Sequence, residues 1–306
     1  MVTHGHSDHA RWGSAHYLTS ARGVEVVRQR VGQDASIQGV PWGESIDLNG
    51  VRVSFHPAGH ILGSAQVRVE YRGEVWVVTG DYKTEPDATC DPFELTPCHV
   101  FVTESTFGLP IYKWKPQHEV FQEINDWWRA NQEKGRTSVL FGYSLGKAQR
   151  LLSGVDSSIG PIVVHGAVQR FVDVYRASGI ALPDVTRGDE AGAALARGRG
   201  LVIGPPSAAN TPWIRKFGSV STAFASGWMQ VRGIRRRRAA DRGFTLSDHA
   251  DWDALLATIR GTGAERVAVT HGYVPQLVRY LQEQGTDAYA LATRYTSEAD
   301  DEETGG

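Results

Sequence analysis

Alternating and β-branched hydrophobic positions dominate the first third of the chain. Segments that begin at Val51, Ala65, Glu74 and His99 read VRVSF, AQVRVEY, EVWVVTG and HVFVTES, and short turns separate them. Such patterns predict strands. Polar residues that could act in catalysis or metal binding follow the carboxyl ends of these segments. The first 110 residues are therefore expected to form a sheet with a functional site at the ends of its strands.

The hydrophobic period changes after Gln117. The stretch EVFQEINDWWRANQEKG has helical spacing and ends at Gly135. Strands then alternate with helices, as TSVLFG precedes LGKAQRLLSG and PIVVHG precedes AVQRFVDVYRASG. The closing part, DWDALLATIRG, RVAVTHG and PQLVRYLQEQG, predicts helix, strand and helix. This alternation is typical of a parallel sheet, and the fold class it predicts is α/β.

Composition narrows the class of protein. The chain has 306 residues, of which 41% are hydrophobic and 22% charged, and no apolar run approaches the ~18 residues of a membrane span. A transmembrane protein and general disorder are excluded. Two cysteines exclude a disulfide framework, and the start lacks the pattern of a secretory signal. We therefore expect a cytoplasmic enzyme with no membrane partner.

Charge is distributed unevenly along the chain. The formal net charge is -2, but the last ten residues are rich in acids, so the remaining body is mildly basic. Arg235 and Arg236 begin a run of arginines that, with Arg232, could clamp a phosphodiester backbone. The alternative is an ordinary solvated loop, since most charge runs are solvated.

The strongest chemical signal lies at the start of the chain, in the string His4-Gly-His6-Ser-Asp8-His9. Such a string can surround metal where a strand turns into a helix. It suits a dinuclear site in which His4 and His6 bind one ion and Asp8 and His9 bind the other. A chance histidine-rich terminus would not explain the interposed Asp8 or the non-repetitive apolar flanks.

Two further candidate ligands follow strands. His60 comes after VRVSF, and Asp81 comes after EVWVV. A bridging Asp81 would hold two divalent ions, zinc or manganese, roughly 3.5–4 Å apart. Alone, either residue is more often a turn residue. Their order and spacing after the first string favour a shared metal site.

These motifs resemble those of a known family. THGHSDHA, AGHILGSA and VTGDYKTEPD resemble, in this order, the metal motifs of the metallo-β-lactamase superfamily. TESTFG around Glu104 and FGYSLGKAQRLL resemble signatures of its β-CASP nuclease branch, and SDHAD around His249 resembles the late histidine motif of that branch. More narrowly, VTESTFGLPIYKW with LFGYSLGKAQR is similar to bacterial exonucleases of the DNA-ligase-associated type.

The resemblance implies a four-layer αββα core with an inserted β-CASP domain built on a parallel sheet. The expected domains are the first part of the core at 1–115, the insert at 116–240, the return to the core at 241–296 and an acidic tail at 297–306. It also implies a metal-dependent exonuclease that hydrolyses phosphodiester bonds of DNA, in repair, alongside a DNA ligase.

The resemblance also implies roles for single residues. Asp8, with His9, is expected to act on the attacking water as well as to bind metal. His249 is expected to complete the shell of the second ion, and its alternative is a turn before a helix capped by a neighbouring aspartate. Glu104 is expected to buttress a ligand histidine. The alternative for Glu104 is an exposed turn acid.

Substrate phosphate has several candidate contacts. Ser144 and Lys147 lie where SLGKAQ turns into a helix, whose amino end favours anions. Simple capping with a solvated lysine is the alternative. His165 and His271 each precede a glycine at a strand end, where a phosphate contact and a structural histidine are equally compatible with the sequence.

The chain departs from the family pattern in two respects. Relatives usually have strands before the first metal motif, whereas Met1 stands three residues before His4, so a complete short form and a truncated chain both remain open. Relatives also offer a histidine shortly before the late motif to protonate the leaving oxygen. Between Ser226 and Ser247 this chain has none, which leaves the general acid open.

Three other functions compete with a DNA exonuclease. An RNA-processing β-CASP ribonuclease is favoured by a late histidine such as His249. A lactam or thioester hydrolase predicts a small domain without the insert. A catalytically dead nucleic-acid binding module would require lost ligands, and this sequence retains all of those in its three metal motifs.

Overall fold

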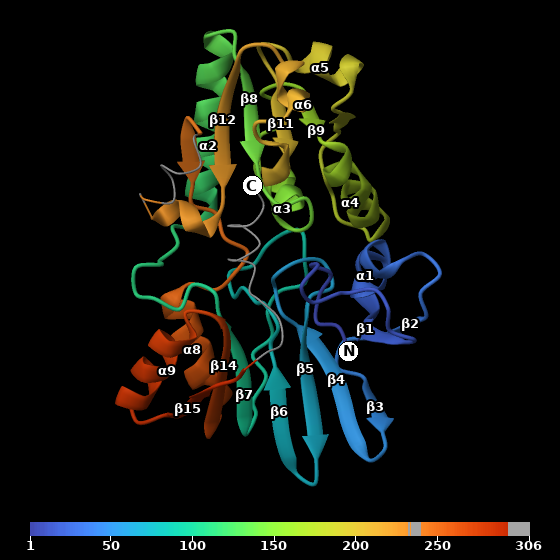
Figure 1. Ribbon diagram of the computed structural model, residues 1–306, viewed down its shortest axis with the longest axis vertical. Helices are drawn as coiled ribbons and strands as arrows, with labels where there is room; N and C mark the ends of the chain where they lie inside the picture. Colours follow the sequence, from blue (N-terminus) through green and yellow to red (C-terminus); the bar gives the residue numbers. More distant parts are fainter. Residues whose placement is uncertain (232, 234–239, 293–306) are drawn as a thin grey trace. The chain divides into compact units, whose positions relative to one another are not determined.

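The computed structural model describes residues 1–231, 233 and 240–292 (Figure 1). The chain forms two units, Met1–Lys113 with the segment from Asp248 onward, and Trp114–Ser247. Each unit is built on its own sheet, and the predicted α/β class is confirmed. Arg232, Arg235, Arg236 and the acidic tail lie outside the described residues.

The first unit contains a mixed sheet of seven strands in the order β15-β14-β7-β6-β5-β4-β3. Strands β3 to β6 pair antiparallel, and β6, β7, β14 and β15 pair parallel. Their bounds are Ser45–Leu48 for β3, Val51–Pro57 for β4, Ala65–Tyr71 for β5, Glu74–Val78 for β6, Val100–Ser105 for β7, Arg266–Gly272 for β14 and Asp287–Ala290 for β15. The four strands predicted from the alternating pattern are thus present.

A second, smaller sheet pairs β1 (Tyr17–Ser20) with β2 (Ile37–Val40) in parallel. A 3-10 turn, η1 (Ala21–Gly23), and helix α1 (Val24–Val31) connect them. This helix was not predicted, because its β-branched residues imitate a strand. Adjacent Val26 and Val27 are both buried, as a helix allows and a half-exposed strand does not.

Helices and the small sheet cover opposite faces of the large sheet. On one face, α8 (Trp252–Thr262) and α9 (Val274–Glu283) pack against a cluster that includes Val77 and Phe101. Val67 pairs with Val78 and therefore points away from Val77, into a cluster with Val40 of β2. Helix α1 packs on the small sheet. The unit is thus layered α, β, β, α, as expected, with two strands in the second sheet among the described residues.

The second unit is built on a six-stranded sheet in the order β10-β9-β11-β8-β12-β13, and all its pairs are parallel. The strands are β8 Thr137–Phe141, β9 Ile162–Val164, β10 Thr186–Arg187, β11 Leu201–Gly204, β12 Val220–Ala225 and β13 Arg242–Phe244. The helices are α2 Gln117–Glu133, α3 Lys147–Gly154, α4 Gly166–Ala177, α5 Glu190–Ala196 and α6 Pro212–Arg215, with 3-10 turns η2 Pro206–Ala208 and η3 Gly227–Gln230. The predicted return to the core at 241 precedes the division at Asp248, because β13 extends this sheet.

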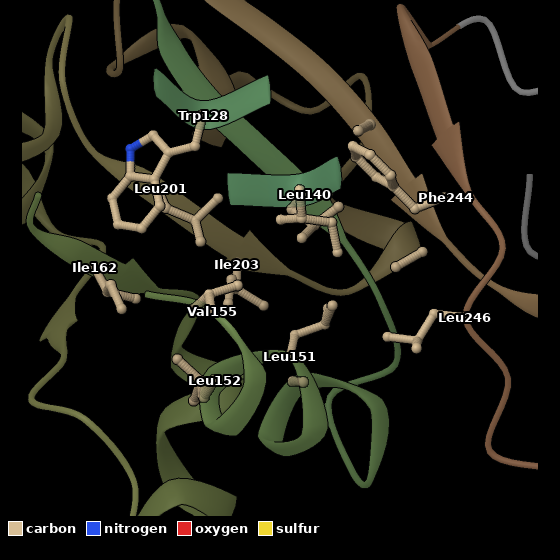
Figure 2. Packing of buried hydrophobic residues seen from close by; sticks show 14 of the residues in the cluster. Trp128, Leu140, Leu151, Leu152, Val155, Ile162, Leu201, Ile203, Phe244 and Leu246 are labelled. Carbon is tan, nitrogen blue, oxygen red and sulfur yellow. The ribbon is translucent and has the colours of Figure 1, made fainter. Parts of the chain in front are cut away.

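The core of the second unit joins its sheet to α2 and α3. Trp128 of α2 and Leu151 of α3 pack against Leu140 and Ile203, which face each other across β8 and β11 (Figure 2). The predicted helix after Gln117 is confirmed, since its buried residues recur at helical spacing. No helix among the described residues is long and apolar enough to span a membrane.

Candidate metal centre

The histidine string lies in a loop whose start is anchored by the first unit. Val2 donates its backbone N–H to Leu18, and the Thr3 carbonyl accepts a hydrogen bond from the backbone of Ala65. A tight turn follows, in which the Ala10 N–H bonds the His6 carbonyl at 2.8 Å. The string therefore folds back on itself and brings its side chains together, in a turn rather than in the predicted helix.

Thr3 orients two of the imidazoles. Its hydroxyl lies 3.2 Å from Nδ1 of His4 and 3.2 Å from Nδ1 of His9. In both rings Nε2 is thus directed to the other side. No sequence pattern marked Thr3 as part of the site.

His60 and Asp81 follow β4 and β6, as predicted. The His60 ring is oriented by Nδ1, which lies 2.9 Å from the backbone carbonyl of Asp248. That carbonyl requires a proton on Nδ1, so Nε2 keeps its lone pair. Gly59 has φ +71°, and a Cβ there would stand 2.2 Å from the Lys83 carbonyl, so only glycine allows this approach.

Four buried donors converge in a first group, His4, His6, His60 and Asp81. Nε2 of His4 lies 3.3 Å from Oδ2 of Asp81, and Nε2 of His60 lies 3.7 Å from the same oxygen. Nδ1 of His6 is 3.1 Å from Nε2 of His60. Three imidazoles and one carboxylate around one point are a donor set that suits zinc, and manganese to a lesser degree.

Protonation in this group favours metal binding. Burial, reinforced by the neighbouring His9, lowers the pKa of His4 to about 4. Burial also lowers the pKa of His60 well below its ordinary value. Although burial opposes ionisation, His9 and His4 hold the pKa of the Asp81 carboxyl well below its usual range. Neutral imidazoles and an ionised carboxylate are the forms that bind a cation.

A second group consists of His4, Asp8 and His9. Nε2 of His9 lies 3.4 Å from Oδ2 of Asp8 and 3.7 Å from Oδ1 of Asp81. Asp81 therefore presents Oδ2 to His4 and His60 and Oδ1 to His9. A carboxylate placed in this way can bridge two ions.

Asp81 also belongs to a third group, with Glu104 and His249. Glu104 is 2% exposed, and so the alternative of an exposed turn acid is wrong. Its carboxylate lies 2.8 Å from Nδ1 of His249 and accepts a 2.8 Å hydrogen bond from the backbone of Tyr82. The cap of α8 is Asp251, so His249 is not needed to start that helix.

His271 is a neighbour of the site whose place the sequence left open. Its ring centroid lies 5.6 Å from that of His9, and its φ is +53°. The register of β14 against β7 shifts between Thr270 and Gly272, which accounts for the unusual backbone of His271. A histidine before a glycine at a strand end was the signal, but it did not distinguish a ligand from a structural residue.

The predicted phosphate contacts have other partners in the second unit. Lys147 is buried, and its ammonium donates a 2.7 Å hydrogen bond to the Leu246 carbonyl, which argues against a phosphate contact. Gly146 rather than Ser144 caps α3. His165 caps α4 by accepting from the Ala167 N–H, and its ring meets Trp213, so the structural interpretation of this histidine is favoured.

The lowered histidine pKa values predict acid sensitivity of the metal-free protein. Between pH 6.5 and about 4 the unfolded chain protonates His4 and the folded chain does not. Stability should therefore fall as pH falls through that window, by roughly 3 kcal/mol from His4 alone. Urea unfolding of chelator-treated protein at pH 7 and pH 5 measures the first part of this loss, roughly 2 kcal/mol from His4. His4→Gln should flatten the dependence, and an equally steep profile in this variant would contradict the assignment.

Comparisons with known proteins found relatives by sequence. No family model matches the chain. A protein named "Probable DNA ligase" from Opitutus terrae is 33% identical over 95% of this chain and 28% of its own length. "Endoribonuclease YSH1" from Yarrowia lipolytica is 29% identical over 47% of this chain and 17% of its own length. The protein of the same name from Saccharomyces cerevisiae is 29% identical over 39% of this chain and 15% of its own length. The chain thus spans less than a third of the length of these relatives.

A solved structure shares the fold. The crystal structure of a protein of unknown function from Enterococcus faecalis V583 superposes with a TM-score of 0.65, at 12% identity, over 96% of this chain and 79% of that one. It supports the α/β architecture. The relatives' names, together with the His/Asp groups, point toward the superfamily that the metal motifs resemble.

Proposed function

We propose that this chain is a metal-dependent nuclease of the β-CASP branch of the metallo-β-lactamase superfamily. The observation that carries the proposal is the placement of Asp81, whose Oδ2 faces His4 and His60 and whose Oδ1 faces His9. Two adjacent cation sites are the arrangement of many phosphodiesterases. The relatives named endoribonuclease support this class of reaction.

The proposed cofactors are two divalent ions, zinc or manganese. Bound there, they would lower the pKa of a water molecule and neutralise charge on the phosphate. The first ion would be held by His4, His6, His60 and Asp81, and the second by Asp8, His9, Asp81 and His249.

Asp8 is assigned a second task in the reaction. Its carboxylate lies beside His9 at the second group of donors, where it can orient the attacking water and accept its proton. Glu104 holds His249 by Nδ1 and leaves Nε2 of that ring for the site. If His271 supplied the ligand beside His9 instead, Nε2 of His249 could protonate the leaving oxygen, provided that the ring carries a proton on both nitrogens.

DNA is the substrate we favour. The similarity to a protein named as a DNA ligase extends over 95% of this chain, whereas the similarity to the endoribonucleases covers less than half of it. We propose an exonuclease that trims DNA ends in repair, beside a ligase. RNA is the second candidate, and the endoribonuclease names are the observation that favours it.

One assay separates these functions. End-labelled and circular forms of single-stranded DNA, and end-labelled double-stranded DNA and RNA, are incubated with the protein and each of zinc, manganese and magnesium. We expect nucleotides released from DNA ends and no cleavage of the circle. Cleavage of RNA alone would replace the proposal by its second candidate. Turnover of a lactam or thioester with intact nucleic acids would refute both.

A further inference from the structure

Helix α3 buries two cations that the proposed reaction does not use. Lys147 is 3% exposed and Arg150 is 1% exposed. The Lys147 ammonium donates to the Leu246 carbonyl at 2.7 Å, and the Arg150 guanidinium donates to the Ser247 carbonyl at 3.1 Å. Two consecutive backbone carbonyls are thus each held by a buried positive charge.

The local structure of α3 makes this double contact possible. Lys147 and Arg150 are three residues apart and lie on one side of the helix. The helix starts sharply, because Gly146 has φ +82° and its N–H is capped by the Gln149 side chain at 2.8 Å. A Cβ on Gly142 would stand 2.8 Å from Cγ of Lys147, so the missing side chain leaves room for the lysine stem.

The next two residues along the chain belong to the metal centre. The carbonyl of Asp248 fixes the His60 ring through Nδ1, and the His249 ring is held by Glu104. Residues 246–249 therefore have four specific partners in a row. The chain passes between its two units inside this segment, after Ser247.

We propose that Lys147 and Arg150 are positioning residues of the metal centre. They fix the backbone at Leu246 and Ser247, and this backbone sets the Asp248 carbonyl and the His249 side chain that follow. The inference rests on the proposed metal function. Desolvating an ammonium and a guanidinium is costly, and apolar side chains would fill the same volume without that cost. An apolar side chain has no hydrogen-bond donor and therefore could not fix the direction of the two carbonyls.

The test measures metal affinity in the full chain. Lys147→Met and Arg150→Met are titrated with cobalt(II), whose absorption reports the ligand geometry, and with zinc in competition. We expect dissociation constants 10- to 100-fold weaker than in the parent and an altered cobalt spectrum, as for the loss of other groups that orient ligands. Lys147→Arg, which keeps a charged donor, should recover much of the affinity.

A matched control separates positioning from general stability. Arg136 also donates to a backbone carbonyl of the second unit, that of Val220 on β12, away from the 246–249 segment. Arg136→Met should keep the parent's cobalt spectrum and affinity. Parent-like affinity in both methionine variants, or an equal loss in Arg136→Met, would overturn the inference.

Two outcomes need their own interpretation: methionine variants that do not fold, and a parent protein that binds metal but cuts no nucleic acid. If the methionine variants do not fold, Lys147→Gln and Arg150→Gln carry the test, because an amide keeps a donor but is shorter and carries no charge. Unaltered cobalt spectra in both would then refute the inference. If the parent binds metal but cuts neither DNA nor RNA, the proposed function fails, whereas the positioning role is judged by metal affinity alone.

Discussion

Asp81→Ala is expected to lower the bound divalent metal from about two ions per chain to one or none and to reduce phosphodiester hydrolysis by on the order of 10³-fold or more. Asp81 belongs both to the group with His4, His6 and His60 and to the group with Glu104 and His249. Its Oδ1 also faces His9 of the remaining group. Its loss removes a negative charge from between several imidazoles, and that charge is what keeps adjacent cations together.

Elemental analysis of the purified protein and the end-labelled DNA assay measure both effects. Asp91→Ala is the matched control, because Asp91 is a partly exposed acid of the same unit whose partner is Arg22. Full metal content and cleavage in this control show that the effect is specific to the site. An Asp81→Ala protein that still carries two ions would exclude a bridging carboxylate.

Asp8→Ala should separate chemistry from binding. The variant is expected to keep the parent's affinity for DNA while cleavage falls 10²- to 10⁴-fold, since the group that orients the attacking water and accepts its proton is gone. Gel-shift titration over a series of salt concentrations measures the affinity, and its salt dependence should match that of the parent, because Asp8 itself contacts no phosphate and His9, Asp81 and His249 remain to hold the second ion. Single-turnover cleavage measures the rate.

The conservative variant Asp8→Asn tests the two roles of this residue. An amide keeps an oxygen near His9 but is a poor proton acceptor, so metal content should be retained better than activity. Cleavage by Asp8→Ala within tenfold of the parent rate would exclude Asp8 as the base. Loss of DNA affinity in proportion to activity would instead make Asp8 a binding residue.

Local patterns predicted the parts of this fold that depend on local physics. Alternating or β-branched residues marked β4 to β7, and helical spacing marked α2, whose buried residues recur along one face of the helix. The histidine string and the positions of His60 and Asp81 after strands predicted donors that the structure brings together, whereas Glu104 and His249 were expected from the family resemblance. Strands β4 and β6 both pair antiparallel with β5 and so run in the same direction, which places the residues that follow them at the same edge of the sheet.

Contacts made by the backbone left no such trace. His60 is oriented by the backbone carbonyl of Asp248. Because every residue has such a carbonyl, the type of residue at position 248 could not predict this contact. Lys147 reads as a surface cation in sequence, and only the tertiary structure buries it. Helix α1 was missed for a different reason, since its valines favour strands and packing against the small sheet overrides that preference.

The separation of the donors along the chain has a consequence for the order of assembly during synthesis. His4, His6, His60 and Asp81 all emerge from the ribosome within the first 81 residues. The partner of Glu104 is His249, which is synthesised 145 residues later, and the carbonyl that orients His60 belongs to Asp248, 188 residues later. Closing loops of this length is slow, and a nascent chain completes its N-terminal contacts first. A growing polypeptide can thus hold one cation early, while the complete centre forms only after the entire second unit has been translated.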